Sequence, residues 1–159
     1  MKKGEIVLIL DNIRSSHNVG SIFRTADGAG VAKVFLCGYT PCPTDKFDRP
    51  NKEIAKTALG AEKVIPWEYA ATTAEAVKSL KQADYQIIAL EQAKDAINYR
   101  EVKLKDKNAI ILGEETKGIV PEVLAECDIV AEIPMLGQKE SLNVSVAAGI
   151  ILFTLISDI

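Results

Sequence analysis

Apolar runs that alternate with amphipathic segments run through most of the chain. The runs "VLIL", "IIAL" and "AIIL" are continuously hydrophobic, which is typical of strands buried on both faces of a sheet. Between such runs lie segments with helical spacing of apolar residues, among them "VGSIFRTADGAG", "NKEIAKTALGA" and "TAEAVKSLKQA". Strands that alternate with helices predict an α/β fold with a mostly parallel sheet and helices on both faces.

The last segment, which begins "SLNVSVAAGI" and ends "ILFTLISDI", predicts a helix with apolar side chains on nearly every face. Ser141 and Asn143 stand at its start, where both residue types are good helix caps. A helix that is hydrophobic on all sides must be buried on all sides, so we expect it to be covered on every face. Its apolar stretch, Val144 to Ile156, falls short of the roughly 20 residues that span a bilayer, and we expect no membrane contact.

Length and cysteine content indicate a single globular domain without a metal site. The chain has 159 residues, of which 48% are hydrophobic, as expected for one globular domain. The three cysteines Cys37, Cys42 and Cys127 have no paired metal spacing, and the single His17 cannot complete a common zinc set. We therefore expect no metal, and free thiols in a cytoplasmic protein.

The net charge of the chain does not decide whether it binds nucleic acid. The formal net charge is −3, whereas affinity for nucleic acid depends largely on Lys and Arg. Local basic residues do occur at Lys46, Arg49, Lys52 and Lys56, but Asp and Glu are interleaved with them. They form either a solvated surface or an RNA contact. The first two belong to the only long loop, residues 38–51, and loops of this length in compact domains are often functional.

Three polar segments that contain glycine follow predicted strands. Asn18, Ser21 and Arg24 follow the first strand, "EETKGIVPE" follows "AIILG", and "LGQKESLN" follows "DIVAEIPM". Ligands of open α/β sheets bind outside the carboxyl ends of the strands, so we expect the three segments to converge on one site. Taken singly, each also has a structural explanation, such as a surface ion pair of Arg24 with Asp27.

In this order, the three segments resemble the motifs of the SpoU (TrmH-like) class of the SPOUT superfamily, knotted RNA methyltransferases that use S-adenosylmethionine. The matching stretches are "NVGSIFRTADGAGV" (18–31), "ILGEETKGIVPEVL" (111–124) and "IPMLGQKESLNVSVAAGI" (133–150). The resemblance implies a C-terminal trefoil knot and a homodimer. It also implies a single SpoU-type catalytic domain over residues 1–159, without a separate RNA-binding domain.

The resemblance also implies an activity and a set of site residues. The expected reaction transfers a methyl group from S-adenosylmethionine to a ribose 2′-hydroxyl in tRNA or rRNA, and S-adenosylhomocysteine is the product. Because a guanidinium keeps its proton in proteins, we expect Arg24 to bind phosphate rather than act as a base. The catalytic residues by resemblance are Asn18, Arg24, Glu115, Ser141 and Asn143. The residues expected to bind the cofactor are Leu112, Gly113, Ile133, Met135, Ser141, Leu142 and Asn143.

Two alternatives remain at this point. One is a knotted methyltransferase that acts on a base nitrogen instead of ribose, and the other is a non-catalytic RNA-binding module of the same fold. A receiver-like signalling domain, suggested by "VLILDN", is disfavoured because the middle strand ends in "IPWEY" without an acceptor Asp. The sequence does not identify the RNA or the modified nucleotide.

Overall fold

A single parallel sheet forms the centre of the molecule. The computed structural model describes residues 4–114 and 116–157. Within these residues the sheet has seven strands in the order β3-β2-β1-β6-β4-β7-β5, and every neighbouring pair is parallel. The strands are β1 (Glu5–Asp11), β2 (Lys33–Cys37), β3 (Trp67–Ala70), β4 (Gln86–Leu90), β5 (Ile97–Asn98), β6 (Lys107–Gly113) and β7 (Ile129–Glu132).

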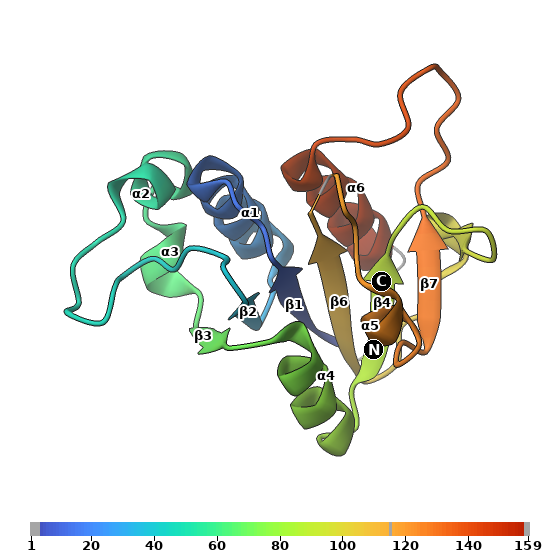
Figure 1. Cartoon of the computed structure of the whole chain (residues 1–159), viewed down its shortest axis with the longest axis horizontal. Helices are drawn as coiled ribbons and strands as arrows, with labels where there is room; N and C mark the ends of the chain where they lie inside the picture. Colours follow the sequence, from blue (N-terminus) through green and yellow to red (C-terminus); the bar gives the residue numbers. More distant parts are fainter. Residues whose placement is uncertain (1–3, 115, 158–159) are drawn as a thin grey trace.

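Helices cover both faces of the sheet, as predicted (Figure 1). Side chains of β1 alternate between two cores: Ile6, Leu8 and Leu10 join one, and Val7 and Ile9 join the other. The first core is shared with α1 (Ser16–Ala29), α2 (Lys52–Ala58), α3 (Ala61–Val64) and α6 (Val144–Ser157), and the second with α4 (Thr73–Gln82) and α5 (Pro121–Leu124); a 3₁₀ turn, η1, spans Tyr99–Glu101.

The register of the strands brings their carboxyl ends to one edge. Asp11, the last residue of β1, pairs with Cys37 at the end of β2 and with Gly113 at the end of β6. Leu90, the last residue of β4, pairs with Leu112 of β6 and Ala131 of β7. The segments that follow these strands therefore begin side by side, although they are far apart in the sequence.

Helix α1 begins and ends with the residues that helix boundaries favour. The Ser15 hydroxyl accepts a hydrogen bond from the Asn18 amide at 3.1 Å, and Gly30 ends the helix with φ of 73°. Gly20 lets α2 approach closely, because a Cβ at this position would overlap Thr57 and the Ile54 carbonyl. The start of α1, which holds the first motif, is thus fixed against α2.

Helix α6 is apolar on all sides, but the chain itself covers only part of it. Ala148, Ile151 and Leu152 are fully buried, whereas Val146 and Phe153 are 50% and 48% exposed. No helix in the described part of the chain combines the length and the hydrophobicity that membrane crossing requires. The exposed flank of α6 is therefore a surface that lacks a covering element within these residues.

Candidate active site

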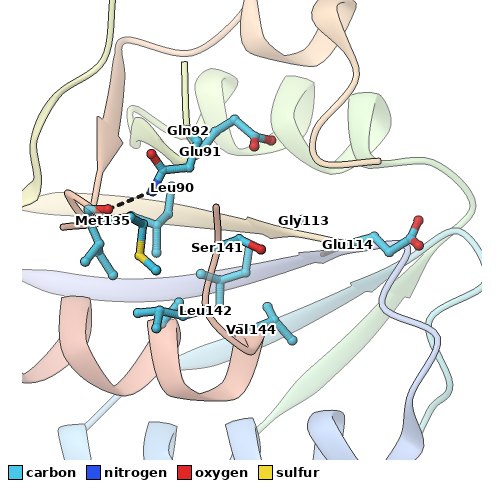
Figure 2. Close-up of a pocket in the computed structure, with 12 residues that line it drawn as sticks. Leu90, Glu91, Gln92, Gly113, Glu114, Met135, Ser141, Leu142 and Val144 are labelled. Atoms are coloured by element: carbon cyan, nitrogen blue, oxygen red, sulfur yellow. Dashed lines mark hydrogen bonds between the residues drawn. The ribbon is translucent and has the colours of Figure 1, made fainter. Parts of the chain in front are cut away.

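A pocket opens at the carboxyl edge of the sheet, between the segments that follow β4, β6 and β7 and the first turn of α6 (Figure 2). Its floor is apolar and its rim carries the carboxylates Glu91 and Glu114. We call it the donor pocket, and it is lined by Leu90, Glu91, Gln92, Leu112, Gly113, Glu114, Ile133, Met135, Ser141, Leu142, Val144 and Ala147.

Six of the seven residues expected to bind the cofactor line the donor pocket: Leu112, Gly113, Ile133, Met135, Ser141 and Leu142. The seventh, Asn143, does not line it but caps α6: its Oδ1 accepts hydrogen bonds from the Ser145 amide at 2.8 Å and hydroxyl at 2.6 Å. Ser141 is exposed and faces the pocket. Ser141 thus lines the pocket, and Asn143 caps the helix.

The segment after β6 forms one wall of the pocket, and two of its glycines let neighbouring residues pack closely against its backbone. A Cβ on Gly113 would lie 2.7 Å from Cγ1 of Ile119, and Gly118 has φ of 64°. A Cβ on Gly118 would also lie 2.5 Å from Oε2 of Glu91. These positions require glycine for steric reasons, so both glycines shape this side of the pocket.

Glu91 and Gln92 connect the walls of the pocket, and the sequence analysis missed them. Glu91 Oε2 accepts a hydrogen bond from the Ile119 amide at 2.5 Å, which fixes the turn after β6. The Gln92 side-chain amide donates to the Ile133 carbonyl at 2.7 Å, which fixes the segment after β7 (Figure 2). Both residues directly follow a buried strand, and the rule that sites lie beyond the carboxyl ends of strands would have identified them.

A second pocket shares Glu114 and Val144 with the donor pocket. It is also lined by Arg14, Asn18 and Thr116. Asn143 Nδ2 lies 3.3 Å from Asn18 Oδ1 and donates a hydrogen bond to it, so the first and third motifs meet here. We call this the acceptor pocket.

Glu114 separates the two pockets and is kept ionised by its neighbours. A hydrogen bond from Thr116 holds the pKa of its carboxyl below the usual value, and a hydrogen bond from Tyr39 and the charges of Arg14 and Lys117 act in the same direction. The Tyr39 hydroxyl lies 3.3 Å from Oε2 of Glu114. The guanidinium of Arg14 lies 5.4 Å from the centroid of the Tyr39 ring, within the range of a cation–π contact.

Arg24 lies apart from both pockets. Its exposed side chain lines a groove on the outer face of α1, together with Ser21, Lys56 and Phe153. The chain by itself therefore brings together the predicted residues Asn18, Ser141 and Asn143, but not Arg24. The remaining predicted catalytic residue, Glu115, lies outside the described residues.

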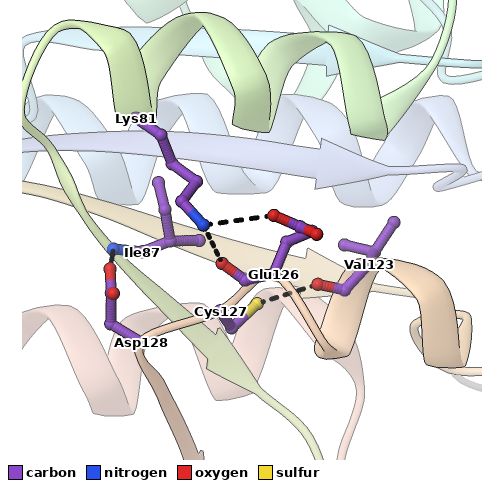
Figure 3. Close-up of polar contacts among 6 residues, drawn as sticks. All are labelled: Lys81, Ile87, Val123, Glu126, Cys127 and Asp128. Carbon is purple, nitrogen blue, oxygen red and sulfur yellow. Dashed lines mark hydrogen bonds and ion pairs between the residues drawn. The ribbon is translucent and has the colours of Figure 1, made fainter.

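Polar side chains at the opposite edge of the sheet are engaged in structural contacts (Figure 3). Lys81 of α4 donates to the backbone and side-chain oxygens of Glu126, both at 3.1 Å. Asp128 accepts from the Ile87 amide at 2.8 Å, and the Cys127 thiol donates to the Val123 carbonyl at 3.3 Å. These contacts tie α4, α5 and the starts of β4 and β7 together, so the candidate site is assigned to the carboxyl edge.

Comparison with known proteins identifies relatives with the same architecture. A family model described as "SpoU rRNA Methylase family" matches residues 5–153. The 23S rRNA (guanosine-2′-O-)-methyltransferase RlmB of Xylella fastidiosa is 36% identical over 93% of this chain and 57% of its own length. RlmB of Pseudomonas aeruginosa is 34% identical over 95% of this chain and 58% of its own length.

Solved structures agree with these sequence matches. The AdoMet-bound rRNA methyltransferase from Sinorhizobium meliloti superposes with a TM-score of 0.87 at 31% identity, over 99% of this chain and 57% of the other. The TrmH/SpoU tRNA modifying enzyme of A. aeolicus superposes with a TM-score of 0.83 at 29% identity, over 97% of this chain and 75% of the other.

The chain spans somewhat more than half the length of the two RlmB relatives, 57% and 58%. Over that span the match takes in the whole sheet, both helical layers and all three motifs. The expected α/β knot fold is confirmed by the structural likeness. The chain belongs to the SpoU rRNA Methylase family.

Proposed function

We propose that this protein transfers a methyl group from S-adenosylmethionine to a ribose 2′-hydroxyl of rRNA or tRNA. The observation that carries the proposal is the donor pocket at the carboxyl edge of the sheet. In support, a solved rRNA methyltransferase that shares the fold over 99% of this chain is described as AdoMet-bound. The names of the RlmB relatives support the 2′-oxygen as the acceptor and guanosine as the modified nucleoside in their own reaction. A base nitrogen is the alternative acceptor.

The lining of the donor pocket suits this methyl donor. Apolar side chains of Leu112, Ile133 and Leu142 would enclose the adenine ring, and backbone groups near Gly113 would reach its polar edge. The described lining contains two carboxylates, Glu91 and Glu114, and no Lys or Arg, a charge balance that favours a sulfonium cation. The bound donor supplies an already activated methyl group, so the protein has to align the acceptor oxygen and assist the loss of its proton.

The acceptor pocket holds groups that suit a ribose and its phosphate. The linked amides of Asn18 and Asn143 can orient a hydroxyl beside the donor pocket. Arg14 supplies a positive charge for a phosphate, and a planar guanidinium binds phosphate with two parallel hydrogen bonds. Thr116 adds a further hydroxyl at the boundary of the two pockets.

Arg24 acts, in this proposal, within a homodimer. The exposed apolar side chains of Val146, Phe153 and Leu59 mark a surface that a second copy would cover. Arg24 shares a groove with Phe153 and Leu59 and lines neither pocket of its own chain. A dimer formed through this face would present Arg24 to the acceptor pocket of the partner, where its guanidinium would bind phosphate and stabilise charge on the attacking oxygen.

We expect the reaction to take place in the cytoplasm. Cys37, Cys42 and Cys127 are free thiols, as is usual in a reducing compartment. The absence of a separate RNA-binding domain also stays a prediction, because the relatives are longer than this chain.

The decisive test of the activity is transfer of a labelled methyl group to unmodified tRNA and rRNA. Alkaline hydrolysis of the product distinguishes the two acceptors, because a methylated 2′-oxygen cannot attack the adjacent phosphate. We expect the label in alkali-resistant dinucleotides. Label in single nucleotides would indicate base methylation, and binding of the donor without transfer to any RNA would favour a non-catalytic module.

A further inference from the structure

We propose that the groove between the 38–51 loop and β3 binds single-stranded RNA next to the nucleotide to be methylated. The inference rests on the proposed function and names the surface that recognises the substrate. We call this surface the loop groove. It has a volume of about 640 Å³, which is in the size range of ligand pockets.

Aromatic side chains line or flank the loop groove, and two of the three are exposed. Trp67 and Tyr69 are two residues apart on β3, so both point to the face beneath the loop. Tyr69 is 52% exposed, and Phe47 in the loop is 66% exposed. Aromatic rings that flank a groove are the stacking platforms of proteins that bind single-stranded nucleic acid, because every base has a face that can stack.

Cations accompany the aromatic rings. Lys46 and Arg49 lie 5.1 Å and 5.0 Å from the centroid of the Phe47 ring. Lys52 and Lys63 line the adjoining groove on the other side of Trp67. Among the described residues, the side chains of Lys46, Lys52 and Lys63 take part in no ion pair, so their charges are available to phosphates.

Most of the nearby acids are engaged in structural contacts. Asp45 accepts hydrogen bonds from the Phe47 and Arg49 amides and from the Arg49 side chain. Glu62 is buried and accepts from the Gly60 amide, and Glu68 pairs with Lys33 at 2.6 Å. Glu53 lies 4.0 Å from Lys56, and Asp48 is exposed. Six cationic side chains lie in this region, against these five acids: Lys33, Lys46, Arg49, Lys52, Lys56 and Lys63. The local balance is therefore slightly positive, although the chain as a whole is acidic, which favours RNA over a basic protein segment.

Shared lining residues connect the loop groove with the groove that contains Arg24. Trp67 and Asn51 line both the loop groove and the adjoining groove. Lys56 in turn lines both the adjoining groove and the groove of Arg24. A strand of RNA that stacks on Tyr69 can thus follow a row of cations towards Arg24, which in the proposed dimer lies beside the acceptor pocket of the partner.

Hydrogen bonds fix this path relative to the acceptor pocket. The Asn51 side chain donates to the Ser16 hydroxyl at 3.2 Å, and the Thr57 hydroxyl donates to the His17 carbonyl at 2.9 Å. Both acceptors lie within two residues of Asn18 in α1. RNA held in the loop groove is therefore held at a fixed position relative to α1, the helix that carries both Asn18 and Arg24, which is what substrate positioning requires.

Two variants test the loop groove. Phe47→Ala/Tyr69→Ala removes the stacking rings, and Lys46→Gln/Lys52→Gln/Lys63→Gln removes three charges. The control is Lys78→Gln/Lys103→Gln/Lys105→Gln, which makes the same change in net charge at exposed positions elsewhere. The measurements are kcat and KM with unmodified tRNA and rRNA, the Kd for S-adenosylmethionine, and the salt dependence of binding to a fluorescent single-stranded oligoribonucleotide.

We expect the aromatic variant to raise KM for RNA by about fivefold or more, the effect of losing one stacked base. The triple lysine variant should make the slope of log K against log salt less steep by about 2, because each lost phosphate contact contributes about 0.7 to the steepness. The Kd for S-adenosylmethionine and kcat should stay at the wild-type values in both, and the control should match the wild type throughout.

An unchanged KM in both groove variants, or an equal loss in the control, would overturn the inference and leave the proposed function intact. A wild-type protein that binds no S-adenosylmethionine and methylates no RNA would instead refute the proposed function. In that case the oligoribonucleotide measurement alone would decide whether the loop groove binds RNA.

Discussion

At the scale of single residues, the donor pocket depends on two side chains that carry no recognisable motif. Glu91 holds the turn after β6 through the Ile119 amide, and Gln92 holds the segment after β7 through the Ile133 carbonyl. Neither wall has a regular secondary structure of its own at these points. The shape of the pocket therefore depends on the hydrogen bonds that Glu91 and Gln92 make from the end of β4.

Replacement of Glu91 tests this dependence. Glu91→Ala removes a hydrogen bond to a charged acceptor, and we expect the Kd for S-adenosylmethionine to rise about tenfold. Glu91→Gln keeps an oxygen acceptor for the Ile119 amide and should restore most of the affinity. Isothermal titration calorimetry measures both, with Glu122→Gln on exposed α5 as the control. A Gln variant as weak as the Ala variant would indicate that the charge itself contacts the donor.

Sequence reasoning named six of the twelve residues that line the donor pocket. Leu112, Gly113 and Leu142 were predicted because they lie in stretches that match known motifs at the ends of apolar runs. The rule for strand ends includes Glu91, but its contact with the Ile119 amide joins residues 28 apart in the sequence and could be found only from the folded chain. The separate location of Arg24 was also unpredictable, since helical spacing does not indicate which side of α1 faces the donor pocket.

At the scale of elements, α6 links the third motif to the core. Asn143 caps the helix, and the Ala147 amide donates to its carbonyl at 3.0 Å. The same side chain reaches Asn18 at the start of α1. The cap and the contact between motifs therefore depend on one residue.

Two substitutions of Asn143 separate these roles. Asn143→Ala should lower the free energy of unfolding by about 1 kcal/mol, the usual cost of a lost helix cap, and should also lower kcat. Asn143→Ser restores a capping oxygen but is too short to reach Asn18, so we expect near-normal stability with kcat still reduced. Urea unfolding and methyl-transfer assays measure the two effects. Recovery of kcat together with stability would assign Asn143 a purely structural role.

The long elements were predictable, and the short ones were not. Strands β1, β4 and β6 follow from continuous apolar runs that are buried on both faces. Strand β5 consists of only Ile97 and Asn98 and pairs with the end of β7. Such a short strand is determined by its partner rather than by its own sequence, so local patterns cannot reveal it.

At the scale of the whole molecule, we propose that two copies of the chain form the active site. The donor pocket and Arg24 belong to different surfaces of one subunit. The exposed flank of α6, with Phe153 48% exposed, supplies apolar area for association. A complete active site would then contain the donor pocket of one subunit and Arg24 of the other.

Mixed dimers test this arrangement. Arg24→Ala should be inactive, and Gly113→Val should be inactive because the new side chain collides with Ile119. Co-expression of the two variants gives mixed dimers with one complete site, and we expect methyl transfer to be partly restored. If Arg24 acted within its own subunit, the mixed dimers would contain no complete site and would stay inactive.

The central claim is that the segments after β4, β6 and β7 form the binding site for the methyl donor. A crystal structure of the protein with S-adenosylmethionine tests it most directly. We predict electron density for the donor enclosed by Leu112, Ile133 and Leu142, with its methyl group directed towards the acceptor pocket beside Asn18. Donor density at another surface, or a donor pocket that stays empty at saturating S-adenosylmethionine, would contradict the account.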